Sequence, residues 1–101
     1  MRIVAVTACA TGIAHTYMAA EQLDKVGKAL GYEIKVETQG ALGVDNELSE
    51  SDIRNAEVVI LAADIKVEKS ERFGSMKVVH VSVLEAIQNP DGIFARIRHN
   101  M

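Results

Sequence analysis

The chain has 101 residues, of which 49% are hydrophobic and 25% charged, and its formal net charge is −3. This length suits one domain with one core, while the slight acidity argues against a nucleic-acid surface, which would show clustered Lys and Arg. The single cysteine excludes an internal disulfide framework, and because neither a membrane span nor a signal peptide is visible, we expect a small globular domain of the cytoplasm.

The first half of the chain alternates between strand and helix patterns. Residues 2–8 are β-branched and small apolar residues, which is typical of a strand buried on both faces. Over residues 14–30 apolar side chains recur at helical spacing, and Gly31 then takes the usual position after a helix end. Residues 32–38 alternate between apolar and charged side chains, which predicts a half-exposed strand at a sheet edge. Residues 39–48 are predicted to form a loop.

The second half repeats this alternation. Ser49 opens a short helix, because its side chain can cap the first turn and acidic residues follow it. Residues 58–63 predict a fully apolar strand, and residues 77–83 a fourth strand. The remaining predicted elements are a helical turn around Phe73 and two helical stretches, 83–87 and 92–97, on either side of Pro90.

This order of elements predicts an α/β fold with parallel strands and right-handed crossovers. The apolar strands 2–8 and 58–63 belong at the centre, and strand 32–38 belongs at an edge. We therefore expect a single domain over residues 1–101, with an open four-stranded parallel sheet in the order 2-1-3-4 and helices on both faces. Open sheets of this kind bind ligands where the strand order reverses, at the carboxyl ends of strands 1 and 3. Cys9, directly after strand 1, lies at that switch point.

The segment that follows the first strand, CATGIAHT, combines a thiol with a helix start. Amides at the start of a helix stabilise a thiolate and bind anions such as phosphate. Gly12 lets the backbone curl around one centre, and the side chains of Thr11, His15 and Thr16 add donors. The pattern predicts a nucleophilic thiolate at Cys9 in a phosphate-binding loop made of Ala10, Thr11, Gly12, Ile13, Ala14, His15 and Thr16.

Plainer interpretations exist for these and other polar residues. A lone cysteine is often a small buried hydrophobe, although the position of Cys9 at a strand-to-helix turn favours a chemical role. His15 has the alternative of capping the first helical turn, and Asp64 either faces the site or caps a turn. His80 is interpreted as structural and His99 as a solvated tail residue. No ligand pair has the spacing of a metal site, so no metal is predicted.

Residues 9–23 (CATGIAHTYMAAEQL) resemble the phosphorylation-site motif of the fructose-type enzyme IIB domains of the bacterial phosphoenolpyruvate:sugar phosphotransferase system. In that family the motif begins Cys-Pro-Thr-Gly-x-Ala-His-Thr. The segments at 36–43 (VETQGALG), 62–64 (AAD) and 71–73 (ERF) are also similar to the family, so the resemblance covers essentially the whole chain. One departure is Ala10, where the family usually has proline, and the loop thereby lacks the φ restriction of that residue.

The resemblance implies a phosphotransferase component in which Cys9 is the catalytic residue. Cys9 would accept phosphate from a phosphohistidine on enzyme IIA and pass it to a fructose-like sugar held by the membrane protein enzyme IIC. The resemblance implies no cofactor, no nucleic acid, and a cytoplasmic location with membrane contact only through IIC. The residues agree, because attack by a thiolate on phosphorus beside a helix N-terminus needs no group that activates water.

Other protein classes that use such a sheet fit the sequence less well. A cysteine phosphatase has a Cys-x5-Arg loop whose guanidinium clamps phosphate, but His15 stands in that place and no arginine lies between Arg2 and Arg54. A receiver-type module needs an acidic pair where this chain has Ala8 and Cys9. The glycine pattern of a dinucleotide-binding loop is absent, and a thiol redox protein would need a resolving cysteine.

Overall fold

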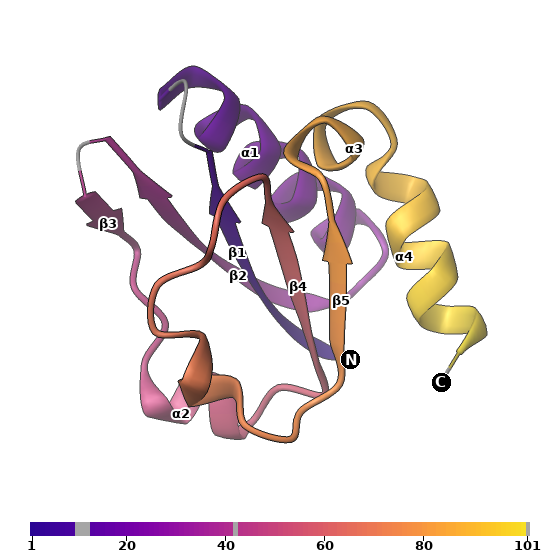
Figure 1. Cartoon of the computed structure of the whole chain (residues 1–101). Coiled ribbons are helices and arrows are strands. Elements are labelled where there is room, and N and C mark those ends of the chain that lie inside the picture. The colour runs from indigo at the N-terminus through magenta and orange to yellow at the C-terminus, as the bar shows by residue number, and fades with distance from the viewer. Residues whose placement is uncertain (10–12, 42, 101) are drawn as a thin grey trace.

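Strands and helices alternate along the chain in the computed structural model, which describes residues 1–9, 13–41 and 43–100 (Figure 1). The strands are β1 (Arg2–Ala8), β2 (Glu33–Gly40), β3 (Gly43–Asp45), β4 (Val58–Ala63) and β5 (Val78–Val81). The helices are α1 (Ile13–Ala29), α2 (Glu50–Arg54), α3 (Val83–Gln88) and α4 (Pro90–His99), with a 3-10 helix η1 (Ser70–Phe73). Within the described residues the strands form one sheet in the order β3-β2-β1-β4-β5.

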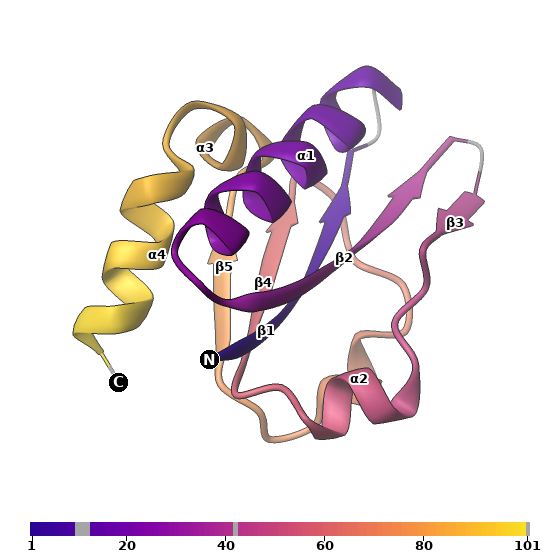
Figure 2. The same ribbon diagram turned by 180° about the vertical axis from the view of Figure 1, so that it is seen from behind.

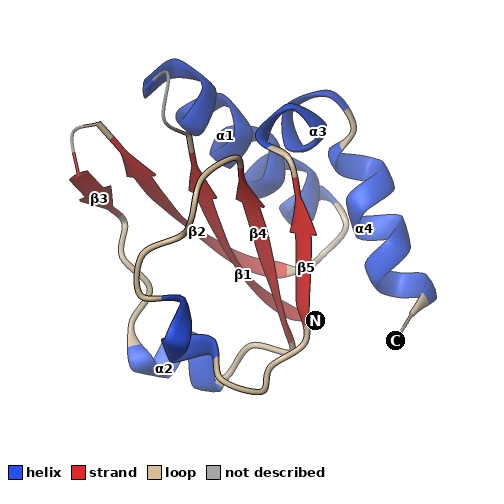
Figure 3. Cartoon of the chain, viewed as in Figure 1, coloured by secondary structure: helices blue, strands red, loops and turns tan. Residues whose placement is uncertain are grey.

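The parallel part of this sheet has the predicted order. β1 pairs in parallel with β2 and β4, and β4 pairs in parallel with β5. The order β2-β1-β4-β5 is therefore the predicted 2-1-3-4. The prediction of four strands, all parallel, is wrong in one detail, because the predicted loop contains the short strand β3, antiparallel to the end of β2 (Figure 3). All three residues of β3 are exposed, so they carry no burial pattern by which a strand is recognised.

β3 covers only the carboxyl end of the β2 edge. Its partners are residues 38–40 of β2, and Gly43 has a φ of +103°, a conformation that glycine adopts readily. Just after β3, the side chain of Asn46 donates a hydrogen bond of 2.9 Å to the carbonyl oxygen of Val36. Among the described strands, β2 therefore remains the sheet edge over residues 33–37. The prediction of a half-exposed strand holds for residues 33–35 and is wrong for residues 36–38, which are buried.

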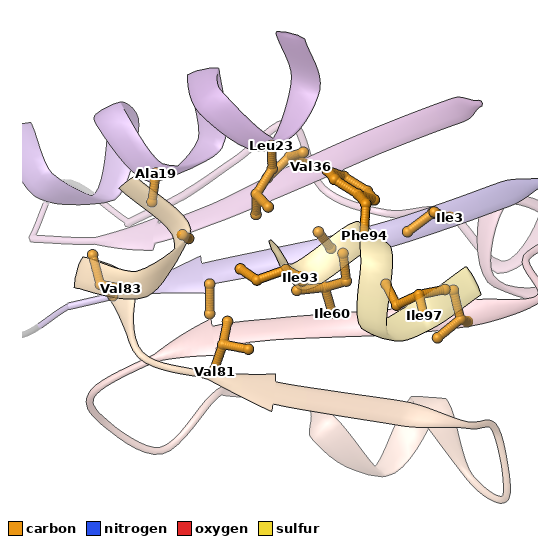
Figure 4. Close-up of a cluster of buried hydrophobic side chains, with 14 of the residues drawn as sticks. Ile3, Ala19, Leu23, Val36, Ile60, Val81, Val83, Ile93, Phe94 and Ile97 are labelled. Carbon is orange, nitrogen blue, oxygen red and sulfur yellow. The ribbon is translucent and has the colours of Figure 1, made fainter. Parts of the chain in front are cut away.

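Helices cover both faces of the sheet, as predicted. α1, α3 and α4 lie on one face (Figure 2) and share a buried cluster that includes Leu23, Ile60 and Phe94 (Figure 4). A smaller cluster on the other face contains Leu48, just before α2, and Phe73 of η1. Because β1 and β4 lie between the two clusters, almost all of their side chains are buried, which explains their continuous apolar sequence.

The helix ends follow capping signals in the sequence. Ser49 caps α2 through a reciprocal pair of hydrogen bonds, since its hydroxyl accepts from the Asp52 N–H at 3.0 Å and the Asp52 carboxylate accepts from the Ser49 N–H at 2.8 Å. Gly31, with a φ of +84°, follows the end of α1. Pro90 is the first residue of α4, so the C-terminal helical stretch forms two helices. None of the helices in the described ranges is long and apolar enough to cross a membrane.

Candidate functional site

Cys9 follows the last residue of β1, at the carboxyl end of that strand. β1 has β2 on one side and β4 on the other, so Cys9 lies at the predicted switch point of the sheet. Cys9 is 7% exposed. It lines a pocket of about 240 Å³ with residues from the end of β2 and from the segments that follow β2 and β4, namely Gln39, Gly40, Ala41, Ile65, Lys66 and Glu68. The thiol-bearing residue is thus nearly buried and still borders an open pocket.

The N-terminal end of α1 lies at the end of the sheet where β1 finishes (Figure 1). The first amides of a helix have no acceptor within the helix, and they carry the positive end of its dipole. The first turn of α1 has no acidic side chain, whereas α2, α3 and α4 each have at least one there. The first turn of α1 therefore contains no carboxylate that would neutralise this positive end, which suits the binding of an anion.

A buried hydrogen bond joins β1 to the first turns of α1. The hydroxyl of Thr7 donates to the carbonyl oxygen of Thr16 at 3.1 Å, and both residues are fully buried. Thr7 lies two residues before Cys9, and Thr16 is the fourth residue of α1. The bond therefore fixes the start of α1 relative to the strand that carries Cys9.

The predicted phosphate-binding loop is only partly within the described chain, because residues 10–12 lie outside it. Ala14 and His15 are exposed in the first turn of α1. Thr16 is fully buried, and the role of its hydroxyl as a donor in the loop stays a prediction. The first turn of α1 thus lies at the carboxyl end of β1, and the backbone carbonyl of Thr16 accepts the bond from Thr7 that joins the two elements.

The remaining candidate residues, Asp64, His80 and His99, do not line the Cys9 pocket. Asp64 accepts a hydrogen bond of 3.3 Å from the N–H of Val83, the first residue of α3, which supports its interpretation as a cap. Its own N–H donates to the carbonyl of Ala8 at 3.1 Å. His80 is exposed on β5 and is not part of the core, and His99 is exposed at the end of α4. Within residues 1–9, 13–41 and 43–100, no three His, Cys, Asp or Glu side chains form a metal-binding group.

One wall of the pocket is held by Gln39, which the sequence analysis did not single out. The side-chain oxygen of Gln39 accepts from the Glu68 N–H at 2.8 Å, and its Nε2 donates to the Glu68 carbonyl at 3.1 Å. Gln39 is also the partner of Ala8 in the β1–β2 register. Its segment, VETQG, is similar to a family motif, and the parallel β1–β2 register places its glutamine beside Ala8.

Gln39 also contacts a buried ion pair. Its Nε2 donates to Glu37 Oε2 at 2.8 Å, and Glu37 accepts two bonds from the Arg72 guanidinium, at 2.9 and 2.6 Å. Burial raises the pKa of Glu37, but hydrogen bonds from Arg72, Gln39 and the Leu48 N–H together lower the pKa below its ordinary value. The carboxylate is therefore charged at neutral pH, although Glu37 is only 1% exposed. The pair joins two segments, VETQG and ERF, whose roles the sequence left open.

Lys66 gives the pocket its positive side chain. It is the only cationic residue among the described pocket residues, which also include the acidic Glu68. Among the described residues no carboxylate forms an ion pair with Lys66, whereas nearby Lys69 pairs with Glu47 at 3.0 Å. The charge of Lys66 is therefore available to an anion in the pocket.

Comparison with known proteins gives matches over nearly the whole chain. Residues 4–96 match the family model described as "PTS system, Lactose/Cellobiose specific IIB subunit". The chain is 46% identical over 100 residues to the "PTS system fructose-like EIIB component 2" of Escherichia coli K12, which covers 99% of this chain and 94% of the relative. The "PTS system fructose-specific EIIABC component" of Mycoplasma pneumoniae is 45% identical over 94 residues, 93% of this chain and 14% of that relative.

A solved structure agrees with these matches. The solution structure of an enzyme IIB subunit of the PTS from Escherichia coli K12 has a TM-score of 0.91 and 40% identity, over 97% of this chain and 91% of the other. The resemblance that residues 9–23 indicated is thereby confirmed at the level of the family. This chain therefore belongs to the IIB family of the sugar phosphotransferase system, and it is a phosphotransferase component of sugar uptake.

Proposed function

We propose that this IIB chain carries a phosphoryl group on Sγ of Cys9. The observation that carries the proposal is the position of Cys9, at the carboxyl end of β1 and four residues before α1, within the segment that resembles the family's phosphorylation motif. The adjoining pocket and the charge of Lys66 support it, since both suit a bound anion. In this proposal residues 1–101 form one phosphocysteine domain, which needs no metal or other cofactor.

In the first step, Cys9 takes the phosphoryl group from a phosphohistidine on enzyme IIA. The thiolate attacks phosphorus, a sulfur–phosphorus bond forms, and the nitrogen–phosphorus bond breaks. The imidazole nitrogen keeps the electron pair and takes up a proton, which balances the proton that the thiol lost. Negative charge spreads over the phosphoryl oxygens in the transition state, and we assign their stabilisation to the loop 10–16, the first amides of α1 and Lys66.

In the second step, the phosphoryl group passes to a sugar hydroxyl held by the membrane protein enzyme IIC. An oxygen–phosphorus bond forms, the sulfur–phosphorus bond breaks, and sulfur keeps the electron pair while the hydroxyl proton is released. The Mycoplasma relative named as an EIIABC component supports IIA and IIC as the partners. The names of the relatives also favour a fructose-like sugar. The domain then works in the cytoplasm and reaches the membrane only through IIC.

The test is transfer from a phosphorylated IIA protein that carries radiolabelled phosphohistidine. We expect label on Cys9 of the wild-type chain, located by mass spectrometry, and no acceptance by Cys9→Ser. Label on His15, or undiminished acceptance by Cys9→Ser, would contradict the proposal. Steady release of phosphate into water without sugar or IIC would instead favour a phosphatase.

A further inference from the structure

We infer that Gln39 is a positioning residue for this phosphoryl transfer, because its amide, oriented by the Glu37–Arg72 ion pair, holds the segment 64–69 beside the Cys9 pocket. The inference rests on the proposed function of Cys9. It assigns a role to three side chains that belong neither to the predicted phosphate-binding loop nor to the groups that contact phosphate in the proposal.

The segment 64–69 forms much of one side of the pocket and has few other attachments. It contributes Ile65, Lys66 and Glu68 to the pocket lining, and Val67 is its one buried side chain. Among the described residues, its other backbone hydrogen bonds are at its two ends, from Asp64 to Ala8 and from Arg72 to Lys69. The two bonds between Gln39 and Glu68, together with the packing of the buried Val67 side chain, therefore hold the middle of the segment.

Glu37 and the backbone of Glu68 together fix the orientation of the Gln39 amide. A carboxylate only accepts hydrogen bonds, so the NH₂ group of Gln39 must face it, at 2.8 Å. The oxygen of the amide then faces the Glu68 N–H, and the second hydrogen of the NH₂ group reaches the Glu68 carbonyl. The reversed amide would lose all three contacts, so the charged carboxylate adds to the preference for the one orientation that holds Glu68 at both of its backbone groups.

Arg72 supplies the charge that keeps Glu37 an acceptor, and it ties the network to the core. Its two nitrogens bind both carboxylate oxygens, and its guanidinium carbon lies 4.9 Å from the ring centroid of buried Phe73. Arg72 of η1 thus holds Glu37, Glu37 holds the Gln39 amide, and Gln39 holds the segment beside Cys9.

A second ion pair offers a matched control. Lys35 lies two residues before Glu37 on β2 and pairs with Asp52 of α2 at 2.8 Å. Neither residue lines the Cys9 pocket. Breaking this more exposed pair changes the same strand and leaves the segment 64–69 attached.

The experiment compares Gln39→Met, which keeps length without hydrogen bonds, with wild type and Lys35→Met. We expect Gln39→Met to lower kcat for transfer from phosphorylated IIA by about tenfold or more, because misplaced groups in a transfer site are costly, with KM for IIA nearly unchanged. The Glu68 amide should exchange with solvent about tenfold faster, since its acceptor is lost. Lys35→Met should match wild type in both measurements, even where its free energy of unfolding falls.

Glu37→Gln is the second variant, and it guards against a Gln39→Met chain that does not fold. It should also lower kcat and speed the exchange of the Glu68 amide, but by less than Gln39→Met, because the remaining side-chain oxygen at position 37 still accepts a hydrogen bond. If either variant folds and transfers phosphate at the wild-type rate, the positioning role is wrong. If the wild-type chain takes no label from the donor, the proposed function fails instead.

Discussion

Thr7 and Thr16, nine residues apart in the chain, are joined by a hydrogen bond of 3.1 Å from the Thr7 hydroxyl to the Thr16 carbonyl. The bond spans the connection in which Cys9 lies, so Thr7→Val should slow acceptance of phosphate by Cys9. We expect the free energy of unfolding to fall by about 1 kcal/mol, the ordinary value of one buried hydrogen bond.

Thr7→Ser is the control for this prediction. It keeps the hydroxyl and removes one buried methyl group, which costs about 1 kcal/mol as well. The role of the bond is supported if both variants lose the same stability but only Thr7→Val transfers phosphate slowly. Equal transfer rates in the two variants would show that the bond serves stability alone.

Lys66 should accelerate phosphate acceptance by its charge. We expect Lys66→Gln to lower the rate of transfer from phosphorylated IIA about threefold to tenfold, with a smaller effect at high salt because the side chain is exposed. Lys69→Gln removes the same formal charge from a residue that pairs with Glu47, and it should have little effect. A similar loss in both variants would indicate that overall charge, and not the place of Lys66 in the pocket, sets the rate.

His15, exposed in the first turn of α1, should orient the loop or the phosphoryl group without being phosphorylated itself. His15→Ala is then expected to slow transfer both to and from Cys9 while Cys9 remains the labelled residue. A variant with wild-type rates and an unchanged phosphocysteine lifetime would leave only the capping role for this side chain.

The lowered pKa of Asp52 makes the free energy of unfolding decrease as the pH falls into the acid range. Hydrogen bonds from Lys35 and from Ser49 lower its pKa from 3.8 to about 2. A depressed folded-state pKa stabilises the fold above the unfolded value and loses that contribution as pH falls through the folded value. Asp52→Asn should therefore be less stable than wild type at neutral pH, and the difference should shrink between pH 3.8 and about 2 in urea titrations. A difference that stays constant over this range would contradict the assignment.

The sequence predicts the central strands well and the polar contacts poorly, for a physical reason. Residues 2–8 and 58–63 are buried on both faces, so each strand is a nearly continuous apolar run whose first and last residues can be read from the sequence. The exposed strand β3 has no such pattern. The position of Cys9 follows from the order of the strands, and the apolar composition of strands 2–8 and 58–63 predicts that order. The contact between Gln39 and Glu68 depends on the β1–β2 register and on the path of a loop 29 residues away, neither of which leaves a local signal.

The short strand β3 also bears on how copies of this chain meet. An open strand edge can pair with another chain and extend the sheet from molecule to molecule. Here β3 occupies residues 38–40 of β2, and the Asn46 side chain occupies the Val36 carbonyl. The open remainder carries the charged Glu33 and Lys35. The part of β2 that a neighbouring copy could pair with is therefore short and charged, a combination that disfavours pairing between sheets of separate molecules.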